Sequence, residues 1–321
     1  MAFDRSISVV VPCYRSSESL PILCDRLIRV LSELCSQYEI ILVNDGSPDN
    51  TWETIKELTN IYSEIKGINL MRNYGQHNAL LCGIRTVQYK LCVTLDDDLQ
   101  NPPEEIPKLI EEIEKGYDVV YGYPARQYHG FFRNLASRIT KLVLQDSMGA
   151  ETAGRTSSFR AFRSLVCEAF RTHKSHLISI DVLLTWGTSR FSAVEVEQKP
   201  REFGTSNYTV VKLMSHALTM LTGFSIKPLQ FTMWLGFYLT IFGVGVLAYV
   251  IISYLILGKS APGFPFLASI ISIFSGAQLF ALGIFGEYLA RIHFRIQERP
   301  PFIIREVSTS QGRSEQQQTN E

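Results

Sequence analysis

Two long stretches without a charged residue lie close together in the second half of the chain. They run from Phe231 to Leu257 and from Phe264 to Gly286, which is 27 and 23 residues. An α-helix needs about 20 apolar residues to cross a bilayer, and a long helix in a soluble protein normally keeps a polar face. We therefore predict two membrane-spanning helices, and this hairpin constrains how the rest of the chain can fold.

The charges that flank these stretches predict the orientation of the hairpin. Lys227 precedes the first stretch, the connector Gly258–Gly263 contains a single lysine, and four arginines follow the second stretch. Because basic residues are retained on the cytoplasmic side, we expect both chain ends in the cytoplasm and a short turn outside. Glu287, at the inner end of the second stretch, is expected at the membrane interface. The four arginines are Arg291, Arg295, Arg299 and Arg305.

Before the hairpin, strand and helix patterns alternate along the chain. Short apolar runs indicate strands, and leucines at helical spacing, such as Leu20, Leu23 and Leu27, indicate helices. Repeated β-α units predict an α/β domain whose mostly parallel sheet is covered on both faces. The predicted strands are Ile7–Val11, Glu39–Val43, Gly67–Met71, Leu91–Leu95 and Asp118–Gly122, and the predicted helices are Ser19–Cys35, Thr51–Ile65, His77–Thr86 and Pro103–Lys115.

Three further segments have distinct patterns. Phe131–Gln145 resembles an amphipathic helix that carries Arg133 among apolar residues. Val210–Phe224 has a similar pattern just before the first uncharged stretch, where such a helix would lie at the membrane surface. The tail Val307–Glu321 is rich in Ser, Gln and Thr, and this composition predicts disorder.

The overall composition excludes several classes of protein. Thirty-one basic and thirty-one acidic residues cancel, so no global field favours nucleic acid as a partner. Six cysteines are scattered without a C-x-x-C pair, which predicts reduced thiols rather than a zinc site or a disulfide framework. The first residues lack the basic start and the long apolar core of a signal peptide.

The segment 91–105, LCVTLDDDLQNPPEE, predicts a ligand site. An apolar strand ends there in three aspartates and is stopped by Asn101-Pro102-Pro103. Open α/β sheets bind their ligands at the carboxyl ends of the strands. Asp96 and Asp98 lie two positions apart and point to the same side of an extended backbone, and two such carboxylates suit Mg²⁺ or Mn²⁺ with a phosphorylated ligand. The alternative is a solvated acidic turn.

Two more polar loops are expected at the same edge. VPCYRSSES follows the first strand and places Pro12 and Tyr14 where they could cover a base or ribose, although the tyrosine could equally belong to the core. VNDGSPDNT follows the second strand, and Asn44 and Asp45 could bind a base there, unless the segment is a plain turn with Asp49 as helix cap. Neither G-x-G-x-x-G nor a P-loop motif is present.

Six motifs in this order resemble those of family 2 glycosyltransferases with the GT-A fold. They are VVVPCY, VNDGSPDNT, RNYGQHNALLCGI, LDDDLQNPPEEIPKL, TSSFRAF and REFGTSNY, and the resemblance covers residues 6 to about 305. More narrowly, the chain resembles polyprenyl-phosphate glycosyltransferases, above all the bacterial undecaprenyl-phosphate aminoarabinose and glucose transferases, while TSSFRAF is closer to dolichol-phosphate mannose synthase. The resemblance implies a Rossmann-like GT-A domain followed by a two-helix membrane hairpin.

The resemblance also implies roles for individual residues. Asp96 and Asp98 would form a D-x-D motif with a bound Mg²⁺ or Mn²⁺, in which Asp98 is the main ligand, Asp96 assists and Asp97 is a bystander. Arg201 and Ser206 belong to a loop of the form R-x-x-G-x-S-[KN]-Y that closes over the diphosphate. The remaining nucleotide-sugar contacts would come from Pro12, Tyr14, Asn44, Asp45 and Gln100.

Two arginines are expected to bind the acceptor, and three other positions depart from the family pattern. Arg133 matches a residue that meets the lipid phosphate, or else it contacts lipid headgroups. Arg126 follows the fifth predicted strand and would replace the acceptor-binding arginine that the family carries in Gly-Thr-Arg. Ser157-Ser158 stands where the bacterial branch has Gly-Asp, Asn207 replaces a common lysine, and Arg15-Ser16 replaces Asn-Glu.

Together these features predict four segments and one activity. The segments are a GT-A domain (1–208), a membrane-surface region (209–229), two transmembrane helices (230–290) and a basic segment with a disordered tail (291–321). The expected activity is inverting, metal-dependent transfer from a UDP-sugar to polyprenyl phosphate at the bacterial inner membrane, by a chain that associates with the bilayer and with its own copies. Alternatives are a processive polysaccharide synthase, although its Gln-x-x-Arg-Trp motif is missing, and a non-catalytic lipid-binding scaffold. Glucose, galactose, N-acetylhexosamine and modified pentose donors all fit.

Overall fold

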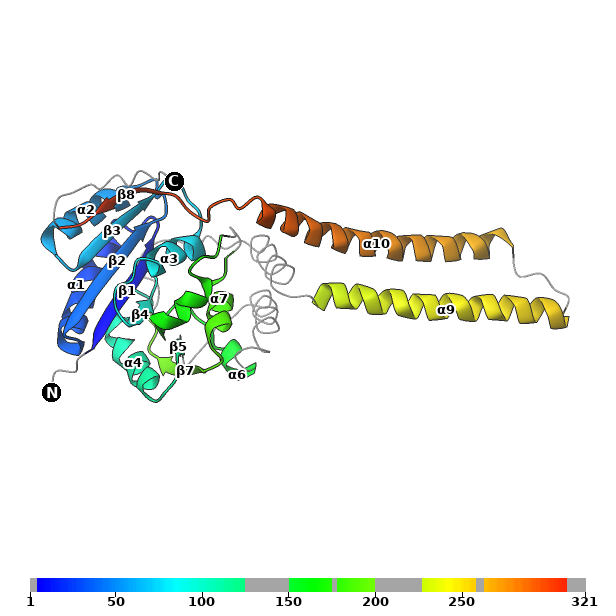
Figure 1. Cartoon of the computed structure of the whole chain (residues 1–321), viewed down its shortest axis with the longest axis horizontal. Coiled ribbons are helices and arrows are strands. Elements are labelled where there is room, and N and C mark those ends of the chain that lie inside the picture. The colour runs from blue at the N-terminus through cyan, green and yellow to red at the C-terminus, as the bar shows by residue number, and fades with distance from the viewer. Residues whose placement is uncertain (1–4, 125–149, 175–177, 200–226, 258–262, 311–321) are drawn as a thin grey trace. The chain divides into compact units, whose positions relative to one another are not determined.

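The computed structural model of the chain describes residues 5–124, 150–174, 178–199, 227–257 and 263–310 (Figure 1). The chain divides into two units. One combines Met1–Met214 with Glu298–Glu321, and the other is Ser215–Gln297. Both predicted amphipathic helices, at 131–145 and 210–224, lie outside the described residues. The first unit therefore contains segments from before and after the predicted membrane hairpin.

The first unit is built on one eight-stranded sheet with the order β7-β5-β6-β4-β1-β2-β3-β8 (Figure 1). Its centre is parallel: β1 pairs with β2 and β4, and β2 pairs with β3. The strand β6 is antiparallel to both β4 and β5, and β8 is antiparallel to β3. The strand bounds are β1 Ser6–Cys13, β2 Gln37–Asn44, β3 Ile65–Leu70, β4 Leu91–Thr94, β5 Val119–Pro124, β6 Arg160–Arg163, β7 Phe191–Val196 and β8 Ile304–Ser308.

Helices cover both faces of this sheet, as the β-α alternation predicts. On one face, α1, α2 and α4 contribute buried leucines and isoleucines to a single core with alternate residues of the strands. On the other face α3 packs so closely that a Cβ at Gly83 would lie 2.3 Å from the Val10 side chain, which only glycine avoids. The helical segments are α1 Ser19–Leu34, α2 Thr51–Ile61, α3 Gln76–Ile84, η1 Pro103–Glu105, α4 Ile106–Glu114, α6 Ala150–Ala153, η2 Ser164–Phe170 and α7 Ile180–Gly187.

The structure corrects the sequence prediction at the far edge of the sheet. Val307 and Ser308, which the composition places in a disordered tail, belong to β8. Backbone pairing with β3 holds this strand, together with a 3.1 Å hydrogen bond from Trp52 Nε1 to Glu306 and a 2.7 Å contact between Thr59 and Ser308 hydroxyls. An edge strand needs only one paired side, so its polar sequence lacks the apolar pattern of a central strand.

Two smaller differences concern one element boundary and several elements that the hydrophobic pattern does not predict. The helix predicted over Thr51–Ile65 ends at Ile61, and Ile65 is instead the first residue of β3. The strands β6 and β7 and the helix α7 were not predicted. The strand β6 is four residues long and carries an arginine at each end, which hides its strand character from a hydrophobic pattern.

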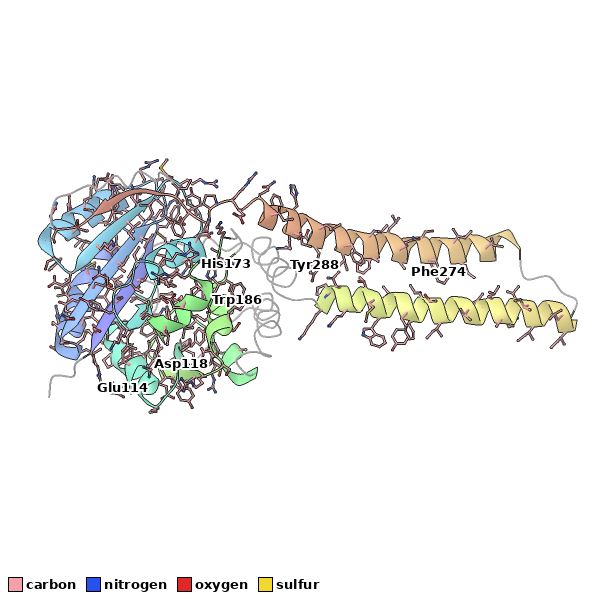
Figure 2. The ribbon with its side chains drawn as sticks, viewed as in Figure 1. Glu114, Asp118, His173, Trp186, Phe274 and Tyr288 are labelled. Atoms are coloured by element: carbon pink, nitrogen blue, oxygen red, sulfur yellow. The ribbon has the colours of Figure 1, made fainter. Side chains whose placement is uncertain are left out.

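The second unit contains two long helices, α9 Lys227–Leu257 and α10 Phe264–Ile296. Both are long and apolar enough to cross a membrane, with mean hydropathies of 2.2 over Lys227–Ser253 and 1.3 over Ile273–Phe294. The two helices pack against each other where Gly243 meets Phe274, since a Cβ at Gly243 would lie 3.1 Å from the phenyl ring (Figure 2). The sequence prediction of two apolar helices is confirmed by length and composition.

Candidate active site at the carboxyl edge of the sheet

Three polar loops meet where β1, β2 and β4 end. These strands are parallel neighbours, with Cys13 of β1 in register with Asn44 of β2, and Val10 of β1 in register with Thr94 of β4. The segments that begin at Tyr14, at Asp45 and at Asp96 therefore leave the sheet at the same edge, as predicted for a ligand site.

The first and third loops are joined by Asp97. Its carboxylate accepts a 3.1 Å hydrogen bond from Tyr14 N and a short one from the Ser16 hydroxyl. Burial raises the pKa of Asp97 to about 6, and the charges of Asp96 and Asp98 add to this while the two hydrogen bonds oppose it. These hydrogen bonds show that the Asp97 carboxylate fixes the loop that carries Tyr14, and that Asp97 is a bystander in metal binding stays a prediction.

The second loop is held by Asn44 and Asp45, both of which are buried. Asn44 Nδ2 donates to Asn69 Oδ1 over 2.8 Å, and the side-chain Oδ1 of Asn44 accepts from Ser47 N over 3.3 Å. Asp45 accepts from Tyr74 N at 2.7 Å and from the backbone N–H of residue 75 at 2.9 Å. Burial raises the pKa of Asp45, and these backbone donors partly oppose that effect. Asn44 and Asp45 thus stabilise this loop and its neighbour, and their contact with a base stays a prediction.

A glycine lets the second loop approach the loop after β3. Gly46 has φ +58°, and a Cβ there would lie 2.3 Å from the carbonyl carbon of Arg72. This left-handed conformation and the close backbone approach both require glycine. The Asp-Gly turn in the sequence thus marks a contact between two loops as well as a change of direction.

Each carboxylate oxygen of Asp96 accepts a hydrogen bond from a neutral side chain. Gln76 Nε2, from the first turn of α3, donates to Oδ1 over 2.6 Å, and the Ser158 hydroxyl, just before β6, donates to Oδ2 over 2.6 Å. Gln76 is not among the predicted site residues, and the sequence indicates Ser158 only as part of Ser157-Ser158, which stands in place of Gly-Asp. Gln76 lies in the quoted motif RNYGQH and Ser158 in TSSFRAF, so the motifs were available, but their convergence on Asp96 depends on the fold.

Asp98 is 7% exposed and lies at a strained point of the chain. It accepts a 3.1 Å hydrogen bond from Gln100 N, and the intervening Leu99 has φ +61°. A buried leucine rarely adopts this conformation, which costs about 1–3 kcal/mol and persists where the surroundings enforce it. The Gln100 carbonyl in turn accepts from Lys199 N over 2.9 Å. The loop therefore holds Asp98 and Gln100 in a defined geometry.

An open pocket of about 310 Å³ adjoins the second loop. Asn44, Ser47 and Asn69 line this pocket, together with Trp52 and Glu53 from α2. Its remaining wall includes two cationic side chains, Arg72 and Arg305. Arg305 comes from β8, which follows the second long helix in the chain. The pocket is thus lined by residues that precede the two long helices in the sequence and by Arg305, which follows them.

Part of the predicted site lies outside the described residues. This applies to the four residues Arg126, Arg133, Arg201 and Ser206. Of the others, Pro12 is the penultimate residue of β1. Tyr14 is 38% exposed, and the Arg15 guanidinium lies 5.7 Å from the centre of its ring. The described part of the site is therefore formed by the loops after β1, β2, β3 and β4.

The carboxylates among the described residues suit a magnesium-type ion whose coordination is completed by other ligands. Among the described residues, no group of three or more His, Cys, Asp and Glu side chains is arranged to hold a metal. Asp96 and Asp98 offer hard oxygen ligands. Mg²⁺ is usually held by one or two carboxylates, with waters and substrate phosphates completing its shell. The residues present fit an ion that binds together with a diphosphate.

A mostly parallel, doubly covered sheet with a D-x-D loop at its carboxyl edge defines an α/β domain of the GT-A type. Comparison with known proteins agrees with this class. The family model for glycosyl transferase family 2 matches residues 8–170. A solved mycobacterial protein shares the fold at 16% identity, with a TM-score of 0.50, covering 68% of this chain and 73% of its own.

Two curated relatives extend the similarity over most of the chain. An undecaprenyl-phosphate 4-deoxy-4-formamido-L-arabinose transferase from Yersinia enterocolitica is 35% identical over 306 residues, covering 94% of each protein. The transferase of the same name from Photorhabdus laumondii is 35% identical over 312 residues, covering 96% of each. The chain belongs to glycosyl transferase family 2. It is a glycosyltransferase, and the resemblance seen in its motifs is confirmed.

Proposed function

We propose that this enzyme transfers a sugar from a UDP-sugar to polyprenyl phosphate at the cytoplasmic face of the inner membrane. The similarity to two undecaprenyl-phosphate sugar transferases over at least 94% of each protein carries this proposal, because it includes the two apolar helices as well as the catalytic domain. A lipid-linked acceptor also explains why a GT-A domain is fused to helices of this length.

A divalent ion, Mg²⁺ or Mn²⁺, would be held by Asp98 with Asp96 assisting. When bound, the ion supplies Lewis-acid stabilisation of the leaving diphosphate. Asp98 supplies a buried carboxylate oxygen fixed by Gln100 N, and Asp96 is oriented by Gln76 and Ser158. Holding both carboxylates in place before the substrate binds lowers the reorganisation needed during transfer.

The acceptor needs no general base for activation. The second pKa of a phosphate monoester is about 6, so the acceptor oxygen is already anionic at neutral pH. That oxygen forms a bond to the anomeric carbon while the bond from this carbon to the diphosphate oxygen breaks, and UDP leaves with the electron pair. Attack from the face opposite the diphosphate inverts the anomeric configuration. Arg133, Arg126 and Arg201 would hold the two anionic substrates together.

The nucleoside end of the donor would lie between Tyr14 and the second loop. Pro12 and the exposed Tyr14 ring would cover the base or ribose, and Gln100 and Ser206 would contact the diphosphate region. The buried Asn44 and Asp45 hold their loops through hydrogen bonds of 2.7–3.3 Å, so they would shape this end of the site as well as contact it.

The two apolar helices would span the inner membrane with both chain ends in the cytoplasm. Lys227 lies at the start of the first helix, and Arg291 and Arg299 lie at or beyond the end of the second, which supports this orientation. Cysteine substitution in the connector 258–263 tests it. Labelling by a membrane-impermeant maleimide in intact cells is expected, and labelling only after lysis would reverse the topology.

The activity is tested with the purified full-length protein in detergent. Undecaprenyl phosphate is incubated with Mn²⁺ or Mg²⁺ and a panel of UDP-sugars: glucose, galactose, N-acetylglucosamine and 4-deoxy-4-formamido-L-arabinose. Mass spectrometry of the lipid fraction should reveal one glycosylated product, absent without metal and absent with Asp98→Ala. No product from any donor, or full turnover by Asp98→Ala, would refute the proposal.

A further inference from the structure

A buried arginine lies beneath the aspartate loop. Arg160 is 2% exposed and lies on β6, in register with Thr94, the last residue of β4. Its guanidinium pairs with Asp181 in the first turn of α7, and its Nε donates to Thr94 Oγ1 over 3.1 Å. Desolvating a guanidinium is costly, and a buried ion pair offsets only part of that cost. The buried ion pair is therefore weak evidence that this arginine is kept for stability alone.

A directed chain of hydrogen bonds leads from this arginine to the candidate site. Thr94 Oγ1 accepts from Arg160 and donates its single proton to the Ser158 carbonyl over 2.9 Å. The Ser158 hydroxyl then donates to Asp96 Oδ2 over 2.6 Å. Because Thr94 has one proton and Arg160 can only donate, the direction of these bonds is set by chemistry. The Thr94 hydroxyl thus restrains the Ser158 backbone, in addition to the pairing of β4 with β6.

We propose that Thr94 and Ser158 are positioning residues for Asp96, and that the buried pair of Arg160 and Asp181 fixes Thr94. This inference rests on the proposed function, in which Asp96 assists in binding the metal and diphosphate. The Gln76 amide holds the other oxygen of Asp96, so the carboxylate is restrained from both sides.

The chemistry of the donors supports a positioning role. Ser158 and Gln76 are neutral, so they orient the carboxylate of Asp96 and preserve its negative charge. The charged member of the chain, Arg160, acts through Thr94, and its charge is balanced by Asp181. Supporting hydrogen bonds of this kind typically change metal affinity or activity by about 10–100-fold when they are removed.

Two substitutions at one buried position form the main test. Thr94→Val keeps the volume of the side chain and removes its hydroxyl, whereas Thr94→Ser keeps the hydroxyl. In the full-length protein in detergent, Mn²⁺ binding in the presence of UDP is measured by electron paramagnetic resonance. We expect Thr94→Val to weaken Mn²⁺ binding and to lower kcat/KM for the donor by about 10–100-fold, and Thr94→Ser to stay within about threefold of the parent protein.

Ser8→Ala provides the matched control for loss of a buried hydroxyl. Ser8 is fully buried on β1 and donates to Glu39 over 2.6 Å, in the half of the strand away from the site. The Ser8→Ala variant should have a lower melting temperature, as Thr94→Val should, and unchanged Mn²⁺ binding and kcat/KM. Equal losses of Mn²⁺ binding in Ser8→Ala and Thr94→Val would show that any destabilised variant loses the ion, and would overturn the proposal.

A double variant shows whether Thr94 and Ser158 act on Mn²⁺ binding through one series of hydrogen bonds or independently of each other. Because Thr94 and Ser158 act through the same carboxylate, Thr94→Val and Ser158→Ala together should weaken Mn²⁺ binding no more than the worse single variant. Additive losses, or wild-type Mn²⁺ binding in folded Thr94→Val, would overturn the proposal. If Thr94→Val fails to fold, Ser158→Ala against Ser158→Thr carries the test. If the parent protein transfers no sugar, the proposed function fails while the Mn²⁺ measurement still decides this inference.

Discussion

Carboxylates at the two opposite edges of the same sheet have different kinds of partner. At the carboxyl edge, Asp45 and Asp97 accept hydrogen bonds from backbone N–H groups and a hydroxyl, all of them neutral. At the other edge, Asp118 precedes β5 and lies 3.0 Å from Arg190 and 3.5 Å from Arg163 (Figure 2). The fold thus supplies charged partners to Asp118 and neutral partners to Asp45 and Asp97.

The pKa values of these groups follow the same division. Burial raises the pKa of both Asp45 and Asp97. Burial alone would also raise the pKa of Asp118, but hydrogen bonds from Thr188 and Arg190 hold it below its ordinary value. Asp118 therefore stabilises the folded state at neutral pH, while the carboxyl edge keeps negative charge at a cost in stability. Raised carboxyl pKa values of this kind are more frequent at functional sites than elsewhere in a protein.

The largest effect that we predict is a loss of activity when an aspartate is replaced at the carboxyl edge but not at the opposite edge. Asp98→Asn removes a charge that would face the metal, and should lower kcat/KM for transfer at least about 100-fold, since metal stabilisation contributes several kcal/mol. The same substitution at the opposite edge, Asp118→Asn, should leave activity per folded molecule within about twofold. Both are measured as lipid-linked product per minute and per mole of folded protein. Equal losses in the two variants would remove the functional distinction between the edges.

The next effect is a difference in how stability depends on pH. Asp97, beside Asp96 and Asp98, has a folded pKa of about 6 against an ordinary value of 3.8. The folded state binds more protons than the unfolded state in this interval, so stability should fall as pH rises from about 4 to 6. The full shift corresponds to about 3 kcal/mol. Asp97→Asn, measured by urea unfolding in chelator and detergent, should flatten this slope. An unchanged slope in the variant would assign it to other groups.

Asp118 should contribute the opposite slope and a smaller effect. Its folded pKa is lowered, so its stabilisation is present at neutral pH and is lost as pH falls below about 4. Asp118→Asn removes the charge that faces Arg163 and Arg190, whose side chains are 43% and 67% exposed. Solvent screening limits the loss to about 1–2 kcal/mol at pH 7, measured by the same urea unfolding. A loss that persists undiminished at pH 3 would contradict the ionic explanation.

Local sequence patterns could predict the position of the aspartates but only part of their surroundings. The apolar run before Asp96 and the prolines after it marked the end of a strand, and strand periodicity placed Asp97 on the other side. Periodicity says nothing about what a side chain meets. The contact of Asp97 with Tyr14 and Ser16 depends on β1 and β4 being neighbours, which is a property of the whole sheet.

The same limit applies to the donors that hold Asp96. Gln76 and Ser158 lie 20 and 62 residues from it in the chain. Ser158 arrives through the antiparallel pairing of β4 with β6, a strand too short and too polar to predict from hydrophobicity. The strand β8 was missed for a similar reason, because an edge strand carries little apolar pattern. The residues that surround Asp96 are therefore set by the pairing of strands far apart in the sequence, which local propensity does not predict.

The smallest predicted effect concerns one side-chain hydrogen bond that attaches β8 to the rest of the sheet. Trp52→Phe keeps most of the buried ring and removes the 3.1 Å hydrogen bond from Nε1 to Glu306 that helps hold β8. One such bond contributes about 1 kcal/mol, and backbone pairing with β3 and the contact of Thr59 with Ser308 remain. Hydrogen exchange at the β8 amides should therefore accelerate about fivefold, with the amides of β1 unchanged. Glu306→Gln, which keeps an acceptor for Trp52, should stay closer to the parent protein. Faster exchange throughout the sheet would mean that β8 is part of the global folding unit rather than a separately attached edge.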